Sequence, residues 1–335
     1  MDYNMIEPNS GSESASESGS ESSSESGSES NYNSSSESDS DSNDKTERQR
    51  IDDDGNYIGP AIELKKTNNI DAEVLKSVEK HKDSICTLGG NECLPKEEKS
   101  KLAQILHVPE KTAIPKAIEK TQCADELCAV KKILNAKTFA EVEQYYKEYG
   151  PLKRNEWLSN FDIDDYLDKL VAISDFDFAN LGFQMIDFDE KDTELNQLTA
   201  EILVKHPNNH IGCVVNTDRS NGNGEHWFAM FIDKEDFARD HKKPISIEYF
   251  NSTGDMPMTS INLWMRGIKL DLKKMKYNAK ITLVRKIAHQ TDDGECGVYA
   301  LFYIIKRLEG KPPSYFMDHL ITDKEMTLFR MALFR

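Results

Sequence analysis

The chain has 335 residues, of which 38% are apolar, and its formal net charge is -17. This length, with 14 Phe, 12 Tyr and 3 Trp, suffices for one or two folded domains with a sizeable core. Residues 1–54 alone carry a charge of -12, so the acidity belongs mainly to one end. Phosphate binding needs clustered Lys and Arg, and we find no such stripe, so the composition argues against nucleic acid as the main partner.

The sequence contains no stretch that approaches the roughly 20 apolar residues needed to cross a bilayer. Its first residues also lack the charged and then apolar pattern of a secretory signal. We therefore expect a soluble protein with no membrane partner, in a reducing compartment. In that setting the six cysteines are expected to be reduced thiols rather than a disulfide framework: Cys86, Cys93, Cys123, Cys128, Cys213 and Cys296.

The first part of the chain is low-complexity sequence, and residues 10–33 repeat an eight-residue pattern of Ser, Gly and Glu. With almost no apolar side chains, it cannot offset a backbone entropy of about 1–2 kcal/mol per ordered residue. We therefore predict a disordered Ser/Glu-rich acidic tail over 1–55. A solubilising role is the simplest interpretation. Because many Ser precede an acidic residue, a phosphorylated tail that docks on a basic partner is the alternative.

Apolar residues three and four positions apart predict helices over 71–81, 96–106 and 139–149. Pro and Gly residues punctuate the stretches between them. We therefore predict a helical N-terminal subdomain over residues 70–150.

Four of the cysteines fall in this subdomain, with spacings C-x6-C and C-x4-C. Ordinary buried thiols are the simplest interpretation. A structural zinc held by Cys86, Cys93, Cys123 and Cys128 is the alternative. Their spacings are looser than those of zinc ribbons, and no nearby His completes a known pattern.

Residues 151–335 are predicted to form an α+β catalytic domain. It begins with an amphipathic helix, whose apolar positions are Ile163, Tyr166, Leu167, Leu170 and Val171. The expected strands are 211–215, 227–232, 245–250 and 281–287. Cys296 then opens an apolar run that ends at Gly310, before two prolines, which predicts a buried helix with a clear end.

Cys296 is the candidate nucleophile of this domain. At a helix start, unpaired backbone N–H groups and the positive end of the helix dipole favour the thiolate and should lower its pKa. A glycine on each side of the Glu295-Cys296 pair lets backbone approach a substrate closely, which a core-filling cysteine would not need. Cys213, in the middle of an apolar strand, is the example of such a core filler.

His226 is the candidate base, because it follows a flexible polar loop over 217–225 and stands at the mouth of a rigid apolar strand. His289 is the main rival. Asn251 ends the next strand, where its side-chain carbonyl could accept the ring N–H of His226 and fix the tautomer. Asn251 could equally be a plain Asx turn.

These residues, taken together with Gln290 six positions before Cys296-Gly297, resemble a known clan of cysteine peptidases. That clan contains the SUMO-specific proteases and the adenovirus protease. It orders its residues His, Asn or Asp, Gln, Cys, whereas papain itself has Cys first. The chain is most similar to the polyprotein-processing protease family of African swine fever virus and other large DNA viruses. The resemblance implies a papain-like cysteine protease fold of the SUMO-protease/adenovirus-protease type with a helical N-terminal extension.

The resemblance also implies roles for further residues. Gln290 would donate to the oxyanion, with the backbone N–H of Cys296 as a second donor. Trp157, in a stretch similar to one in the SUMO proteases, and Trp227 would flank a tunnel that only Gly-Gly passes. Cleavage would then follow Gly-Gly in Gly-Gly-X sites, and neither a metal nor a cofactor would be needed.

The expected task is maturation of viral structural polyproteins, in the virion and in the host cytoplasm. A deconjugase for ubiquitin or a SUMO-like modifier has the same chemistry and a different protein substrate. Acyl transfer by the same residues is a further alternative. An inactive scaffold or binding protein of the particle is disfavoured, because all four catalytic positions hold competent residues.

Overall fold

The computed structural model describes residues 51–65, 69–153 and 156–335. Most of the predicted acidic tail, residues 1–50, lies outside the described residues. The last five residues of that predicted tail, 51–55, do form structure. Ile51 bridges to Tyr57, and the side chain of Asp52 accepts the backbone N–H of Asn56 at 2.8 Å.

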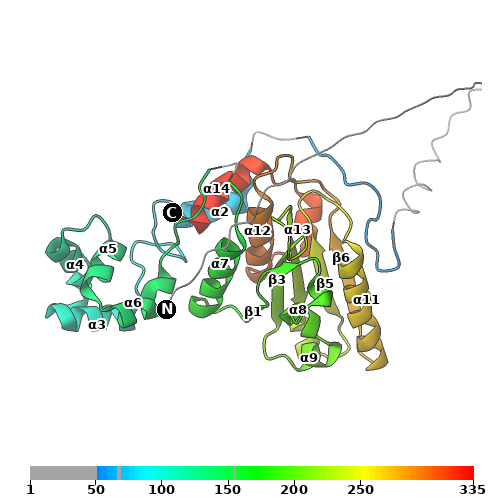
Figure 1. Cartoon of the computed structure of the whole chain (residues 1–335), viewed down its shortest axis with the longest axis horizontal. Coiled ribbons are helices and arrows are strands. Elements are labelled where there is room, and N and C mark those ends of the chain that lie inside the picture. Colours follow the sequence, from blue (N-terminus) through cyan, green and yellow to red (C-terminus); the bar gives the residue numbers. More distant parts are fainter. Residues whose placement is uncertain (1–50, 66–68, 154–155) are drawn as a thin grey trace, which may run out of the picture. The chain divides into compact units, whose positions relative to one another are not determined.

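A mixed sheet forms the centre of the region over residues 151–335, with the strand order β1-β3-β4-β5-β6 and with β2 also paired to β3 (Figure 1). The β3-β4 and β4-β5 pairs are antiparallel, and the β5-β6 pair is parallel. The bounds are Phe178–Asn180 for β1, Gln184–Met185 for β2, His210–Asn216 for β3, Trp227–Asp233 for β4, Ile245–Phe250 for β5 and Ala279–Val284 for β6.

The position of strand β4 in the sheet explains why its sequence is nearly continuously apolar. Its alternate residues enter two different clusters of buried side chains, Trp227 and Phe231 in one and Phe228 and Met230 in the other. A strand buried on both faces has no need of a polar side. The run that predicted a strand therefore also marks the middle of a layered core.

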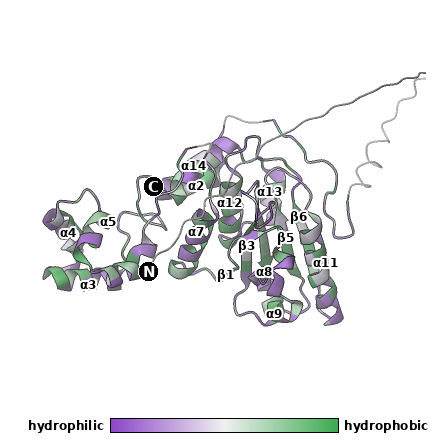
Figure 2. Ribbon diagram, viewed as in Figure 1, coloured by the Kyte–Doolittle hydropathy of each residue, from purple (hydrophilic) through white to green (hydrophobic). Residues whose placement is uncertain are grey.

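Helices cover both faces of the sheet (Figure 1). One face packs on α7 (Asn160–Ile173) and α12 (Cys296–Leu308), and all 13 residues of α12 are buried. The other face packs on α11 (Thr259–Lys274), which carries both apolar and polar residues in Figure 2. The smaller helices of the domain are η3 (Phe188–Glu190), α8 (Glu194–Gln197), α9 (Ala200–Lys205), α10 (Glu235–Arg239), α13 (Pro313–Asp318) and α14 (Asp323–Leu333). These layers confirm the predicted α+β fold.

The helical region before this domain has a buried cluster of its own, formed by residues between Leu94 and Tyr146. Its elements are α3 (Lys96–Leu106), η1 (Glu110–Thr112), α4 (Ala113–Thr121), α5 (Glu126–Ile133), α6 (Ala136–Val142) and η2 (Glu143–Tyr145). Helix α2 (Ala72–His81) instead packs on α14 and contributes Val74 to the buried cluster that contains residues of α7 and α12.

The prediction of reduced thiols in this region was wrong. Cys86 is bonded to Cys93 and Cys123 to Cys128, with Cα atoms 4.9 and 5.7 Å apart. The cysteines of each pair are close in sequence, and a short loop or a helix start brings the second cysteine back to the first. Four cysteines consumed in two disulfides cannot act together as thiolate ligands, so the alternative of a zinc site is also excluded here.

Residues 51–62 form a segment that we call the strap, because it lies along the outer edge of β6. The side-chain amide of Asn56 donates to the carbonyl of Ile281 at 2.9 Å and accepts from the N–H of Leu283 at 2.8 Å. It thus occupies the place that a neighbouring strand would take on an exposed sheet edge. Further along, Ile62 forms a parallel bridge with Ile287.

Candidate active site

Cys296 is the first residue of α12, and its side chain is 3% exposed. Burial raises the pKa of its thiol, while the backbone N–H groups of Trp227 and Gly297 act in the opposite direction. The prediction of a lowered pKa was therefore wrong for the free protein, because desolvation outweighs the helix N-terminus. The contact with the Trp227 amide places the sulfur beside the residue that follows His226.

His226 lies directly before β4, and its Nε2 is 2.9 Å from Oδ1 of Asn251. Burial lowers the pKa of His226, and the bond to Asn251 opposes that shift. Because Oδ1 can only accept, Nε2 carries the proton, and Nδ1 is the nitrogen left with a lone pair. The raised thiol pKa and the lowered imidazole pKa together favour a neutral pair before substrate binds, rather than the thiolate that the sequence predicted.

Asn251 reaches His226 because β4 and β5 are antiparallel, with Phe250 opposite Ala229. Its Oδ1 also accepts the backbone N–H of Thr253 at 3.0 Å and the Thr253 hydroxyl at 2.9 Å. The Asx turn and the contact to His226 therefore coexist. Its Nδ2 donates to the hydroxyl of Tyr249 at 3.0 Å, which fixes the amide with the oxygen toward the imidazole.

Gln290 is brought to the same place through Ser252, the residue after Asn251. Its Oε1 accepts the Ser252 hydroxyl at 2.7 Å, and its Nε2 donates to the carbonyl of Asp292 at 2.5 Å. An amide nitrogen has two hydrogens, so one N–H of Gln290 is held by Asp292 and the second is available to a ligand.

The two tryptophans are brought near each other, in different environments. The indole N–H of Trp227 donates to the carbonyl of Leu158 at 3.1 Å, and its ring is buried in the core. Trp157, the neighbour of Leu158, is 51% exposed and can contact a ligand. A Cβ on Gly297 would lie 3.1 Å from the Leu158 side chain, so this glycine permits the close approach of the segment to α12.

His289, the rival base, is excluded by its contacts. Its Nε2 donates to the carbonyl of Phe316 at 3.0 Å, and its Nδ1 accepts the N–H of Ile321 at 3.2 Å. Burial lowers its pKa to about 4. A neutral ring with both nitrogens occupied by the backbone has a structural role.

Sequence reasoning missed the residues that hold the loop around Gln290 and Cys296. Arg330 of α14 donates to the carbonyl of Gly294 at 2.8 Å and forms a fully buried ion pair with Glu295. Asp323 accepts the backbone N–H of Thr291 at 3.1 Å. These partners are some 30 residues apart in sequence, and no local pattern signals them.

The turn after Asn251 is likewise held from a distance. Arg285 donates from Nε to the carbonyl of Gly254 at 2.6 Å and from Nη1 to the carbonyl of Gly59 in the strap at 2.8 Å. Gly254 has φ +78, and a Cβ there would meet Ala61 at 2.3 Å. The strap is therefore part of the structure that places Asn251.

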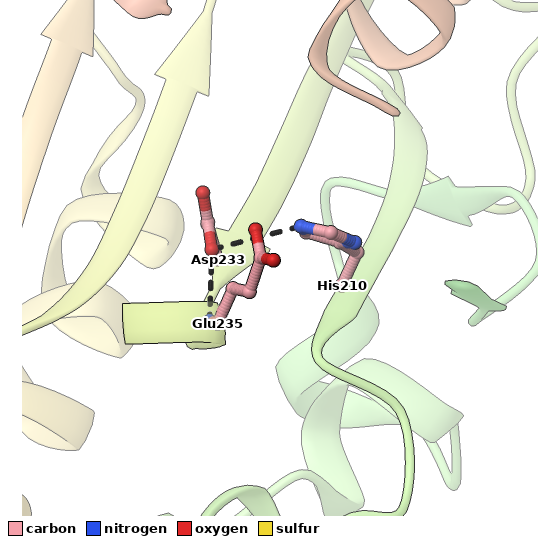
Figure 3. A group of neighbouring side chains, drawn as sticks. All are labelled: His210, Asp233 and Glu235. Atoms are coloured by element: carbon pink, nitrogen blue, oxygen red, sulfur yellow. Dashed lines mark hydrogen bonds and ion pairs between the residues drawn. The ribbon is translucent and has the colours of Figure 1, made fainter. Parts of the chain in front are cut away.

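One group of possible metal ligands, His210, Asp233 and Glu235, occurs among the described residues (Figure 3). His210 pairs with Asp233 across β3 and β4, whereas Trp227 pairs with Asn216 at the strand ends beside His226. Asp233 already binds Arg307 at 2.9 Å and accepts the backbone N–H of Glu235 at 3.0 Å. We interpret the group as ion pairing at the end of the sheet remote from the site.

Comparisons with known proteins find cysteine proteases among the relatives of this chain. Residues 208–335 match the model of the Ulp1 protease family, C-terminal catalytic domain. A SUMO-1 cysteine protease of African swine fever virus is 39% identical over 208 residues, which span 58% of this chain and 74% of the relative. A protein of Acanthamoeba polyphaga mimivirus, named as a candidate thiol protease, is 26% identical over 63% of this chain and 69% of its own.

The fold has a solved counterpart as well. The crystal structure of the African swine fever virus protease is 31% identical, with a TM-score of 0.60, over 75% of this chain and 96% of that one. Within the described residues, we find no helix that is both long and apolar enough to span a bilayer. The matches confirm the predicted kind of enzyme, a cysteine-type peptidase. The chain belongs to the Ulp1 family of cysteine proteases.

Proposed function

We propose that this protein is an endopeptidase that cleaves after Gly-Gly and matures structural polyproteins of a large DNA virus, with Cys296 as its nucleophile. The observation that carries the assignment of residues is the 2.9 Å contact of His226 Nε2 with Asn251, next to a sulfur held against the Trp227 amide. The similarity to a protease of African swine fever virus supports the viral setting.

The mechanism follows from the protonation of the pair. As the Cys296 sulfur attacks the carbonyl carbon of the substrate glycine, its proton passes to Nδ1 of His226. The second N–H of Gln290 and the backbone N–H of Cys296 stabilise the oxyanion. His226 then gives the proton to the leaving amine, and a water deprotonated by His226 releases the acyl group. Asn251 keeps the imidazole in one tautomer throughout.

The segment around Trp157 supports a preference for small residues at the cleavage site. It is fixed to Trp227 by the indole hydrogen bond. Leu158 packs against Gly297 so closely that position 297 has no room for a side chain. The half-exposed ring of Trp157 therefore stands beside the start of α12. In the proposed complex, substrate glycines would pass between the rings of Trp157 and Trp227, where larger side chains would not fit.

A deconjugase for a ubiquitin-like modifier is the second candidate, and it is favoured by the relative that is named a SUMO-1 cysteine protease. Both enzymes would share the same four residues and would differ in how they bind the substrate outside the Gly-Gly segment. A polyprotein site is an extended peptide. A modifier is a folded domain that needs a broad complementary surface.

Cleavage of two substrate sets separates the candidates. One set is unstructured peptides with internal Gly-Gly-X, and the other is intact ubiquitin and SUMO fused at their C-termini to a fluorophore. We expect cleavage of the peptides that disappears in Cys296→Ala, with little turnover of the modifiers. The reverse preference would make the protein a deconjugase, and no Cys296-dependent turnover of either set would favour an inactive scaffold.

Two further proposals concern the setting of the enzyme. We propose that the enzyme acts in the virion and the host cytoplasm, the setting expected of a protease that matures viral structural polyproteins. The acidic segment, whose first 50 residues lie outside the described structure, would dock on a basic partner when its serines are phosphorylated. Loss of such binding after phosphatase treatment, measured with the full chain, would test the second proposal.

A further inference from the structure

Ser252 makes three hydrogen bonds to residues 289 and 290, although it belongs to the turn that follows β5. Its backbone carbonyl accepts the N–H of His289 at 2.8 Å and the N–H of Gln290 at 2.9 Å. Its hydroxyl donates to Oε1 of Gln290 at 2.7 Å. The side chain is 1% exposed, so water does not replace these bonds when they are lost.

The orientation of the Gln290 amide follows from its two partners. The carbonyl of Asp292 can only accept, so the nitrogen Nε2 must face it. The oxygen Oε1 then faces Ser252, whose hydroxyl must donate. Asp292 fixes one end of the amide and Ser252 the other, and the amide plane cannot rotate while both bonds hold. The direction of the second N–H is thereby set as well.

We infer that Ser252 is a positioning residue that aims the oxyanion donor of Gln290, an inference that rests on the function proposed above for Gln290. Asn251 holds His226, and the next residue holds Gln290. One dipeptide at the end of β5 therefore sets both the base and the oxyanion donor. Preorganised donors contribute to catalysis only when they point to the place where charge develops.

Loss of the Ser252 hydroxyl has a specific expected signature. The hydroxyl bonds to Gln290, whereas His226 is held by Asn251. The reactivity of the Cys296 sulfur toward an alkylating agent should therefore survive, because alkylation needs no oxyanion. Stabilisation of a tetrahedral adduct should fall, because that adduct places an oxygen in front of the Gln290 N–H.

The test is a double-mutant cycle with Ser252→Ala, Gln290→Ala and the combined variant, assayed on the Gly-Gly substrate that the wild-type protein cleaves best. We expect Ser252→Ala to lower kcat about 10-fold with KM nearly unchanged, and Gln290→Ala to lower it about 100-fold. In the Gln290→Ala background, Ser252→Ala should change kcat less than about twofold. Ser260→Ala is the matched control, since Ser260 donates to the Ile186 carbonyl at 3.1 Å and should leave kcat unchanged.

Two further readouts distinguish positioning from a general structural effect. Inhibition by a peptide aldehyde ending in Gly-Gly should weaken about 10-fold in Ser252→Ala. The rate of iodoacetamide alkylation of Cys296 should stay at the wild-type value. If Ser252→Ala does not fold, Ser252→Cys is the alternative variant, because it keeps the volume and has a weaker donor. Its kcat should lie between that of the wild type and that of Gln290→Ala.

The outcomes separate this inference from the proposed function. If Gln290→Ala slows cleavage and Ser252→Ala does not, Ser252 has no positioning role. The inference about Ser252 is then wrong, while the proposed function is unaffected. An equal loss for Ser252→Ala in both backgrounds, or a matching loss of alkylation, would show that Ser252 acts elsewhere. If Gln290→Ala retains full activity, the oxyanion role fails and this inference fails with it.

Discussion

The helical region between Cys86 and Tyr146 and the active-site end of the sheet are held together in different ways. In the helical region, both disulfides join cysteines that are 7 and 5 residues apart, and helix caps such as Asp125 on the Cys128 N–H are local. At the active site, the decisive bonds connect distant segments, as Arg285 does with Gly59. The disulfides and helix caps of the helical region are local, and the Cys86–Tyr146 bridge joins its own two ends, whereas the site depends on bonds from the whole domain.

The two free cysteines give the sharpest form of this comparison, since both are buried and only Cys296 lies at the site. Burial raises the pKa of the Cys213 thiol in the middle of β3. We expect Cys296→Ala to lower kcat at least about 10⁴-fold with little change in melting temperature. Cys213→Ala should cost some stability and leave kcat unchanged. Equal activity losses for the two variants would contradict the assignment of the nucleophile.

His289 provides a pH test of the long-range bonds around the site. Its pKa is about 4 in the folded protein against 6.5 ordinarily, so the unfolded chain binds the proton more readily. Stability from this residue is present above about pH 6.5 and is lost as the pH falls toward 4, by about 3 kcal/mol. His289→Gln should flatten this part of the stability curve, measured by denaturant unfolding between pH 7 and 4. An unchanged slope would refute the neutral buried ring.

Asn251 and Tyr249 test how far the positioning of His226 depends on the end of β5. Asn251→Ala should lower kcat about 30-fold, because the imidazole loses the partner that fixes its tautomer. Tyr249→Phe removes the hydroxyl that fixes the Asn251 amide and should cost less, about threefold. Steady-state kinetics, with Thr253→Val as a comparison, would check the order of the two losses in kcat. A larger loss in Tyr249→Phe than in Asn251→Ala would contradict it.

The disulfides test the local side of the comparison. Replacing Cys123 and Cys128 together by Ser should lower the stability of the helical region by about 2 kcal/mol, because a short loop gains freedom in the unfolded chain. Cleavage activity at low temperature should be unchanged, as no described bond joins this pair to the site. Hydrogen exchange of α4 and α5 with and without reductant would measure the effect. Faster exchange in β4 as well would contradict the claim that the disulfide stabilises only the helical region.

The sequence was sufficient where burial or spacing is local. The apolar run that became β4 and the run closed by Gly310 both became elements at the expected places, as did the helix over Lys96–Leu106. The three candidates that contact or neighbour one another at the site, His226, Asn251 and Cys296, each stand at an element end. Such ends can be read from the change between polar and apolar sequence.

Elements were misjudged where a distant partner ends them. The helix predicted over 139–149 stops at Val142, and the chain turns so that Tyr146 can bridge to Cys86. The strand predicted over 281–287 ends at Val284, because Arg285 turns toward Gly254. Val171, assigned to the apolar face of its helix, is 38% exposed. The disulfides were missed because the expected compartment, rather than the spacing, decided the prediction.

The most direct test of the central claim is the intact mass of the protein after reaction with a peptide that carries a vinyl sulfone after Gly-Gly. A thiolate adds to this group at the position of the scissile bond, so the adduct marks the nucleophile. We predict a single adduct that maps to Cys296, with labelling strongly slowed in His226→Ala and absent in Cys296→Ala. Labelling of Cys213, or equal labelling in all three proteins, would contradict the account.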